Sequence, residues 1–293
     1  MNRYKFVNDQ DQHLHTLDGK ALIGTSTIAK GVGKGDGRLS WWAAGKACET
    51  MGWIKPVKDQ TDKWAVVNEQ ERLNGAVRAW ESICKMSSHL SYLELLDKAY
   101  RAHATNLKKT AKSGVDLHAF LETFIRFEID ELPFGQSLCS MDGWKQIEPF
   151  IEWSKKNVKQ WLFSEIHVFS LELGVGGIID CGYIDKDNCF CIGDFKSGGA
   201  WYSGMTQIGG YDIQFFENGG VGFDANGEVA YRLDLNIDTI GKKHVIFPFK
   251  NGFKQPVIST DVDANRESFR CATILYKNQM AFEKMIEARN GKS

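Results

Sequence analysis

The sequence has no apolar run that approaches the roughly 18 successive residues needed to cross a membrane. Its N-terminal stretch, MNRYKFVNDQDQHLH, is polar and lacks the apolar region of an export signal. An excess of charge is absent too, because 36 Lys and Arg residues stand against 37 Asp and Glu residues. That balance excludes a histone-like nucleic-acid binder, although a local basic groove would not show in the net charge. We expect a cytoplasmic protein with no membrane partner.

Cysteine motifs are also missing. The seven cysteines include no C-x-x-C pair, which argues against a four-thiolate zinc site and a disulfide framework. Cys189 and Cys191 alternate within a predicted strand, and we interpret them as small buried residues rather than metal ligands. What the sequence does have is an ordinary globular composition. Its 43% hydrophobic and 12% aromatic residues predict a well-filled core.

Proline is scarce, and none occurs between Pro56 and Pro133. This absence favours a helical block, because proline interrupts helices. Apolar residues at helical spacing predict five helices in and around this block, the last with Pro149 in its first turn. Their expected ranges are 39–53, 68–86, 91–109, 114–131 and 149–161.

The segment before this block has a different character. Residues 1–20 predict one or two polar strands around a turn at Asp18-Gly19. The Gly-rich segment 30–37 does not follow the G-x-x-x-x-G-K-[ST] order of a phosphate-binding loop, so we interpret it as a flexible turn.

After residue 163 the pattern changes to an alternation of period two, which predicts three consecutive antiparallel strands: FSEIHVFSLE, GIIDCGYID and CFCIGDFK. A helix at 201–217, a hairpin of EVAYRLDLN and KHVIFPFK, and a final amphipathic helix at 263–289 are expected next. No linker separates the halves. We therefore predict one continuous α/β domain, with an N-terminal strand and helical region at 1–110 and a core at 111–293.

Two acids and a lysine stand out in these strands. Asp180 ends an apolar run, and Asp194 and Lys196 lie on one face of the next strand. Acidic residues in apolar strands are costly to bury unless they are paired or bound to a metal. Converging carboxylates suit a hard divalent cation such as Mg²⁺. The alternative is a structural Asp–Lys pair at a sheet surface, and these residues alone do not decide between the two.

Their surroundings resemble the RecB-like exonuclease branch of the PD-(D/E)xK nuclease superfamily. GGIID, which ends at Asp180, and GDFKS, which contains Asp194 and Lys196, correspond to the defining acidic and D-x-K strands. GVDLH, which ends at His118, matches the G-x-x-x-H element of an upstream helix. The resemblance implies a restriction-endonuclease-like core, that is, a mixed central sheet flanked by helices. The N-terminal helical elaboration would cover the active site and form a channel for a strand.

Two further elements complete the resemblance, which covers residues 111–217. QIGGY, from Gln207 to Tyr211, matches the Q-x-x-x-Y element of the helix after the lysine strand, and Glu165 supplies the glutamate of the first strand. A softer likeness to phage-type and mitochondrial-genome-maintenance exonucleases lies in GTSTI at 24–28, interpreted as a strand, and in the helix with Trp41 and Trp42. Some relatives carry a four-cysteine iron–sulfur cluster, but only Cys271 follows Cys191 here, so we expect no cluster.

The resemblance also implies roles at the centre of the site. His118, Asp180, Asp194 and the backbone carbonyl of Phe195 would hold Mg²⁺ or Mn²⁺. The imidazole ligand favours Mn²⁺ to some degree. Lys196 would position the attacking water.

Around that centre the implied roles leave alternatives open. Glu165 would orient a ligand or Lys196, or it is a plain exposed strand residue. Gln207 and Tyr211 lie on one helical face and would contact DNA by hydrogen bonds or stacking. The alternative for Tyr211 is ordinary helix packing.

These expectations converge on a divalent-metal-dependent DNA exonuclease that acts on ends or single strands. The alternatives are a structure-specific or restriction-type endonuclease and a catalytically silent DNA-binding module of a recombination complex. The chain retains both acids and the lysine, which a silent copy would usually have lost. Partner proteins in phage or bacterial replication, recombination or repair are conceivable.

Overall fold

The structure is a computed structural model. It describes residues 4–9, 12–31, 38–50, 99–102, 117–129, 141–223, 229–235 and 240–289, together with isolated helical positions between 70 and 85. The chain forms two compact units, one of residues 1–34 and 114–293 and the other of residues 35–113. The first unit contains every residue expected at the site. It also includes residues 1–34, which the prediction had grouped with the helical region at 1–110. No described helix is long and apolar enough to cross a membrane.

The second unit contains helix α2 (Arg38–Thr50), where the sequence predicts a helix from residue 39. The end of that prediction, 51–53, lies outside the described residues. So do most of the helices predicted at 68–86 and 91–109, although the positions described within them are helical. Residues 32–37 of the Gly-rich segment are likewise outside the described part of the chain.

The first unit is an α/β structure built on a mixed sheet, whose strand order is β11-β10-β7-β6-β5-β8-β9. Strands β5, β6 and β7 run antiparallel, as the sequence predicts, while β10 lies parallel to β7 and β4 lies parallel to β6. The strands of this sheet are β4 (Ile23–Gly24), β5 (Val158–Ser170), β6 (Val175–Asp185), β7 (Phe190–Lys196), β8 (Gly220–Phe223), β9 (Val229–Leu233), β10 (Lys242–Pro248) and β11 (Val257–Ser259).

The predicted hairpin of EVAYRLDLN and KHVIFPFK is wrong. Strand β9 pairs with β8, whereas β10 pairs with β7 and β11. The difference follows from burial: β9 is exposed along most of its length, while four successive residues of β10, from His244 to Phe247, are buried. A continuous buried run is typical of a strand covered on both faces, as parallel strands are.

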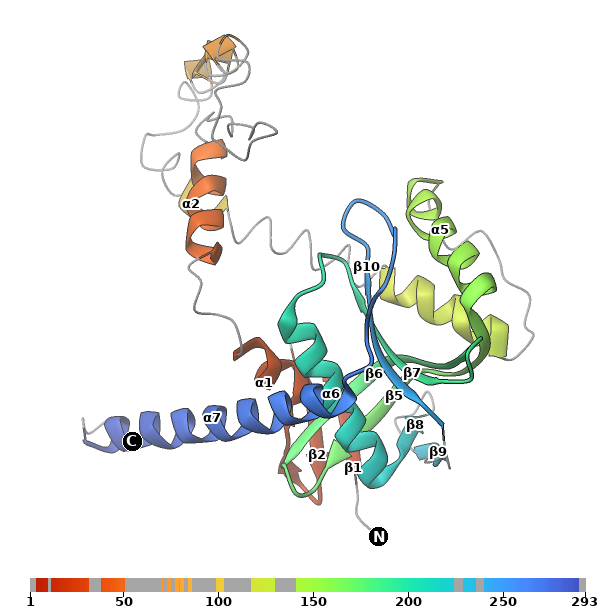
Figure 1. The fold of residues 1–293 in the computed structure, drawn as a ribbon. Helices are drawn as coiled ribbons and strands as arrows, with labels where there is room; N and C mark the ends of the chain where they lie inside the picture. Colours follow the sequence, from red (N-terminus) through yellow and green to blue (C-terminus); the bar gives the residue numbers. More distant parts are fainter. Residues whose placement is uncertain are drawn as a thin grey trace. The chain divides into compact units, whose positions relative to one another are not determined.

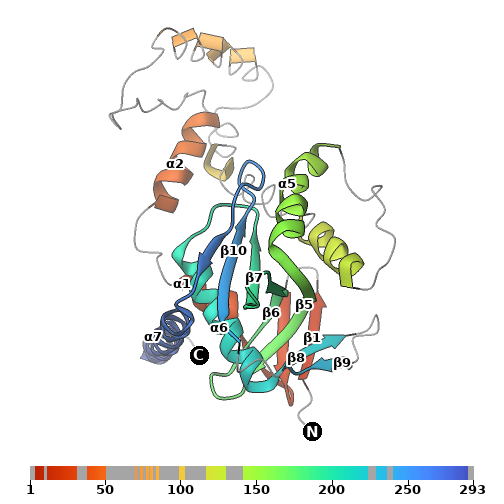
Figure 2. The same cartoon turned by 45° about the vertical axis from the view of Figure 1, so that its right-hand side comes forward.

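Helices cover both faces of this sheet (Figures 1 and 2). On one face, α6 (Tyr202–Asn218) packs Ile208, Tyr211 and Phe215 against β5, β6, β7 and β10. On the other face, α5 (Met141–Asn157) and the helix at 117–129 form a second core with the opposite side chains of the strands. The candidate site residues described below lie where these two layers meet the middle strands.

The predicted boundaries of α5 need correction. The helix begins at Met141 rather than near 149, so Pro149 lies inside it, and it ends at Asn157. Residues 158–161 belong to β5 instead, because Val158 and Trp161 pair with Asp185 and Tyr183 at the end of β6.

The N-terminal segment forms part of the same unit. Strands β1 (Tyr4–Asp9), β2 (Gln12–Leu17) and β3 (Lys20–Ala21) make a small antiparallel sheet. Its predicted turn at Asp18-Gly19 is confirmed, with positive φ at both residues, as two-residue hairpin turns require.

The strand predicted at 24–28 is wrong, because residues Thr25–Gly31 form helix α1. Thr25, Ile28 and Ala29 are buried at helical spacing, and the contacts of α1 with α6 and α7 favour a helix. The last helix of the unit, α7 (Val262–Arg289), matches its prediction.

Candidate metal centre

Three acidic residues lie at neighbouring positions on three adjacent strands. Glu165 of β5 lies between two residues that pair with the flanks of Asp180 on β6. On the other side of β6, the register pairs Cys181 with Gly193, so Asp180 and Asp194 come next to this pair on their strands. Carboxylates placed directly across neighbouring strands repel one another. The sheet register therefore concentrates negative charge at one point.

A local irregularity in β5 directs Glu165 to this point. Phe163 and Ile166 pack in the same core cluster although they are three residues apart, so the alternation of side chains shifts between them. Glu165 itself has a φ of +50°, a left-handed conformation that non-glycine residues rarely adopt. No pattern in the sequence reveals this backbone conformation.

His118 reaches the acids from the helix at 117–129. Phe120, Leu121, Phe124 and Ile125 are buried and hold this helix against the sheet. The Nδ1 atom of His118 lies 3.6 Å from Oδ2 of Asp180 and 4.0 Å from Oε1 of Glu165. Ligand atoms of these three residues all lie within 4.8 Å of one another, close enough to share one metal ion. Gly114, the first residue of the predicted G-x-x-x-H element, lies outside the described residues.

A chain of polar contacts holds Lys196 beside Asp194. The Lys196 ammonium lies 2.6 Å from Oδ2 of Asp194 and donates a hydrogen bond of 3.1 Å to Oε1 of Gln207 on α6. The Gln207 amide nitrogen in turn donates to the Tyr211 hydroxyl at 2.6 Å. The Phe195 backbone N–H donates to Oδ2 of Asp180 at 2.6 Å. The structure therefore joins Lys196 and Gln207 directly and leaves the Phe195 carbonyl ligand as a prediction.

Tyr211 is buried, with 5% of its surface exposed. Its ring packs on Gly177 of β6, where an added Cβ would lie only 2.6 Å from Cε1 of Tyr211. Gly177 belongs to the GGIID segment, so the glycine has a steric role in admitting this ring. In this arrangement Tyr211 orients Gln207, and the contact of both residues with DNA stays a prediction.

The charges at the site perturb one another strongly. Burial raises the pKa of Asp194 to about 6, although Lys196 opposes the shift, and burial likewise raises the pKa of Asp180 to about 6. Burial alone would lower the pKa of His118, but Asp180, Glu165 and Asp194 outweigh it and raise that pKa to about 9. Burial likewise opposes the ammonium of Lys196, yet Asp194 and Asp180 raise its pKa. The three carboxylates thus carry more negative charge than Lys196 and His118 can balance.

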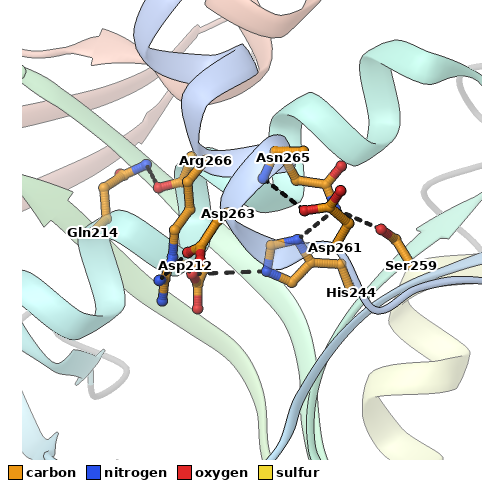
Figure 3. Close-up of polar contacts among 10 residues, drawn as sticks. Asp212, Gln214, His244, Ser259, Asp261, Asp263, Asn265 and Arg266 are labelled. Atoms are coloured by element: carbon orange, nitrogen blue, oxygen red, sulfur yellow. Dashed lines mark hydrogen bonds and ion pairs between the residues drawn. The ribbon is translucent and has the colours of Figure 1, made fainter.

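A second buried polar cluster, which the sequence patterns missed, joins α6 to α7 (Figure 3). Asp212 follows Tyr211 directly and accepts a hydrogen bond from Nε of Arg266, and Nε2 of His244 lies 3.8 Å away. Asn265 bridges Nδ1 of His244 at 3.1 Å and the Ser259 hydroxyl at 3.0 Å. The signal that could have found it is an acid within the apolar helical run GGYDIQFF.

Comparison of the sequence with protein-family models gave no match, and comparison with curated proteins gave none either. The function is therefore inferred from the geometry of the site and from its residue pattern.

Proposed function

We propose that the protein is a divalent-metal-dependent DNA exonuclease with a restriction-endonuclease-like core. The observation that carries the proposal is the cluster of His118, Glu165 and Asp180, whose ligand atoms lie within 4.8 Å of one another. Asp194 lies on the adjacent strand and is paired to Lys196. Carboxylate and imidazole ligands together with a lysine are the equipment of metal-assisted phosphodiester hydrolysis. The order of these residues in the chain, shared with the RecB-like motifs, supports DNA as the substrate.

The donor set fits a hard divalent cation. Asp180 and Asp194 are almost fully buried, and burial raises the pKa of both carboxyls, so their ionised forms lack sufficient compensating charge. A cation held by His118, Glu165 and Asp180, with Asp194 beside them, would supply that charge. When bound, it would polarise a phosphate oxygen and lower the pKa of a coordinated water.

The protein's own groups do the positioning. Asp194 and Gln207 fix the Lys196 ammonium from two sides, at 2.6 Å and 3.1 Å, and its raised pKa keeps it protonated. A protonated lysine does not act as a base, so Lys196 orients the attacking water and stabilises negative charge at phosphorus. The Phe195 N–H keeps the Asp180 carboxylate in place. Tyr211 and Gln207 complete the support from α6.

The test is digestion of a DNA strand labelled at one end, presented in linear and circular form. Wild-type protein is assayed with Mg²⁺, with Mn²⁺ and with EDTA, beside Asp194→Asn. The matched control is Asp187→Asn, because this carboxylate also pairs with a lysine, yet its side chain is 79% exposed. We expect metal-dependent loss of the linear strand alone, abolished by Asp194→Asn and unchanged in the control.

Other outcomes would change the assignment. Metal-dependent cutting of circles would identify an endonuclease at the same site. Binding of DNA by the folded wild-type protein without cutting under any metal condition would contradict the proposal and favour a silent binding module. Equal activity in Asp194→Asn and wild type would place the reaction elsewhere in the molecule.

A further inference from the structure

The second half of α7 is exposed on all its sides. The buried residues of this helix end at Thr273, and every residue from Lys277 to Arg289 is exposed. Figure 1 shows this half of the helix extending beyond the sheet of the first unit. An isolated helix of about 12–15 residues is only marginally stable in water, because tertiary packing supplies most helical stability. Contact of its apolar side chains with a partner would stabilise this half of α7.

One face of α7 carries the repeat of a coiled coil. Along this face, residues recur at alternating intervals of three and four, the spacing that keeps side chains on one side of a helix. The repeat consists of Ser268, Cys271, Leu275, Asn278, Phe282 and Met285. Arg289 follows at the next position of the same repeat. The face is therefore continuous from the packed half of α7 into the exposed half.

The first half of this face borders a groove of about 470 Å³. Tyr202, at the start of α6, forms one wall, and α7 forms the other with Cys271 and Leu275 among its lining residues. Glu267 also borders the groove, and its side chain is 67% exposed. This end of the face therefore combines a hollow with apolar walls and an accessible acid.

The second half of the face has the opposite shape and charge. Phe282 and Met285 project from it, with 61% and 69% of their surfaces exposed. The repeat ends at the basic residue Arg289, which is also the last residue of α7. Exposed apolar groups beside a base at this end thus complement the apolar groove beside an acid at the other.

We propose that two copies of this chain pair through α7 in antiparallel orientation, so that Phe282 of each copy enters the groove of the other. A two-fold symmetric pair uses the same surface twice, which a face with complementary ends allows. With Phe282 opposite Cys271 of the other copy, Met285 meets Ser268, because the helices run in opposite directions. The same register brings Arg289 within one helical turn of Glu267.

The apolar area on this face is sufficient for a specific interface. Five large apolar side chains on or beside the repeat are between 43% and 69% exposed: Ile274, Leu275, Phe282, Met285 and Ile286. Burial of roughly 100 Å² of each would remove about 1,000 Å² from water in the two copies together, near the lower limit for a specific interface. The contact with the groove adds to this area.

The first test is sedimentation of the full chain over about 1 to 100 µM, in EDTA and without DNA. We expect a dimer that dissociates on dilution. Phe282→Ala should weaken association about 100-fold, because each dimer loses two buried rings. The matched control is Met280→Ala, since Met280 is 37% exposed but lies about 200° around the helix from Phe282. Circular dichroism checks that α7 and the rest of the fold are retained in both variants.

Charge reversal tests the orientation of the two helices. Glu267→Arg and Arg289→Glu should each weaken association roughly 5- to 10-fold, because each places like charges at both ends of the interface. The double variant Glu267→Arg/Arg289→Glu should recover the wild-type affinity. Glu287→Arg is the control, because this residue makes the same charge change on the side of α7 away from the repeat.

Each other outcome would overturn the pairing or its geometry. A monomer at every concentration would exclude the second copy, and binding of that monomer to phosphatidylglycerol vesicles would assign the apolar face to a lipid surface instead. A dimer unaffected by Phe282→Ala would place the interface elsewhere. Failure of the double variant to recover affinity would overturn the antiparallel arrangement. None of these results depends on whether the protein cuts DNA.

Discussion

Two buried polar clusters include side chains of α6, and adjacent residues of this helix connect to them. Tyr211 belongs to the metal centre, through Gln207 and Lys196, whereas Asp212 belongs to the cluster with Arg266 and His244. Both clusters contain nearly inaccessible carboxylates: Asp194 and Asp212 are each 1% exposed. The clusters differ in whether nearby positive charges balance the carboxylates.

In the α6–α7 cluster, the single carboxylate of Asp212 faces the guanidinium of Arg266 and the ring of His244. At the metal centre, three carboxylates share one lysine and one histidine, and burial raises the pKa of Asp180 and Asp194. A carboxylate with a matching positive charge needs no further cation, whereas an excess of buried carboxylates would be stabilised by one. The comparison distinguishes a charge-matched cluster from the site at which we propose a metal ion.

Removal of a carboxylate at the metal centre should have the largest effect, and on activity alone. Asp180→Asn is expected to lower the rate of DNA hydrolysis about 1000-fold or more, because metal-assisted stabilisation is worth several kcal/mol. Its melting temperature in EDTA should equal or exceed that of the wild type, since a buried ionised acid is removed. Melting curves and end-labelled digestion check both parts. A large loss of stability in EDTA would show that Asp180 is a structural residue like Asp212.

The corresponding change in the α6–α7 cluster should affect stability instead. Asp212→Ala leaves Arg266 and His244 without their acid and is expected to destabilise the fold by about 3 kcal/mol, with or without metal. Urea unfolding measures this difference. Asp263→Ala is the matched control, because Asp263 pairs with the same arginine at 3.1 Å but its side chain is 92% exposed. Similar losses of stability in Asp212→Ala and Asp263→Ala would show that the buried partner of Arg266 contributes no more than the exposed one.

A methyl group at Gly177 should displace side chains at the metal centre and leave the α6–α7 cluster unchanged. In Gly177→Ala the new Cβ would lie 2.6 Å from the Tyr211 ring and 2.8 Å from Oγ1 of Thr25, so one of them must move. We expect about 1–3 kcal/mol of destabilisation from overpacking and reduced hydrolysis as Gln207 shifts. Gly45→Ala, where the Cβ meets no atom within 4 Å, is the control. Full activity in Gly177→Ala would show that Tyr211 does not position Lys196.

The smallest expected effect is a pH dependence of metal stabilisation. The pKa of Asp180 and of Asp194 is raised to about 6, so the protonated form of each group stabilises the folded state. This contribution to stability is complete below about pH 4 and is lost as pH rises to about 6. The pKa of His118 is raised to about 9, so its contribution is complete below about 6.5 and is lost as pH rises through about 9. A cation binds the deprotonated groups.

The shift in melting temperature between Mn²⁺ and EDTA should therefore increase from pH 5.5 to pH 8.5, by a few degrees. In His118→Gln the increase above pH 6.5 should be lost, while the increase at lower pH remains. A shift that is independent of pH would show that the cation binds elsewhere.

Much of the site was predictable because it lies on strongly periodic elements. The sequence alternation in β5, β6 and β7 predicted that Asp180, Asp194 and Lys196 lie close together, and the structure places them on neighbouring strands. The helical spacing of α6 was predicted as well. The position of Glu165 was not predictable, because it depends on a positive φ within a strand rather than on residue type.

Long-range pairing was harder to infer than local structure. The segments of β9 and β10 were identified as strands, but adjacency along the chain suggested a hairpin that does not form. Likewise, Asp212, His244 and Arg266 come from three separate elements, and no local pattern joins them. Local periodicity reports which face of an element is buried, and it does not report which distant element covers that face.

The pairing of β4 with β6 has a consequence for synthesis of the chain. Gly24 pairs with Gly176, and Thr25 donates a hydrogen bond to the Gly176 carbonyl, so the N-terminal segment completes its contacts across about 150 residues. At roughly 5–20 residues per second, it waits about 8 to 30 s on the ribosome for its partner strand. Residues 35–113, the second unit, are made during that interval. Residues 23–25 thus acquire these partners only after the second unit has been synthesised.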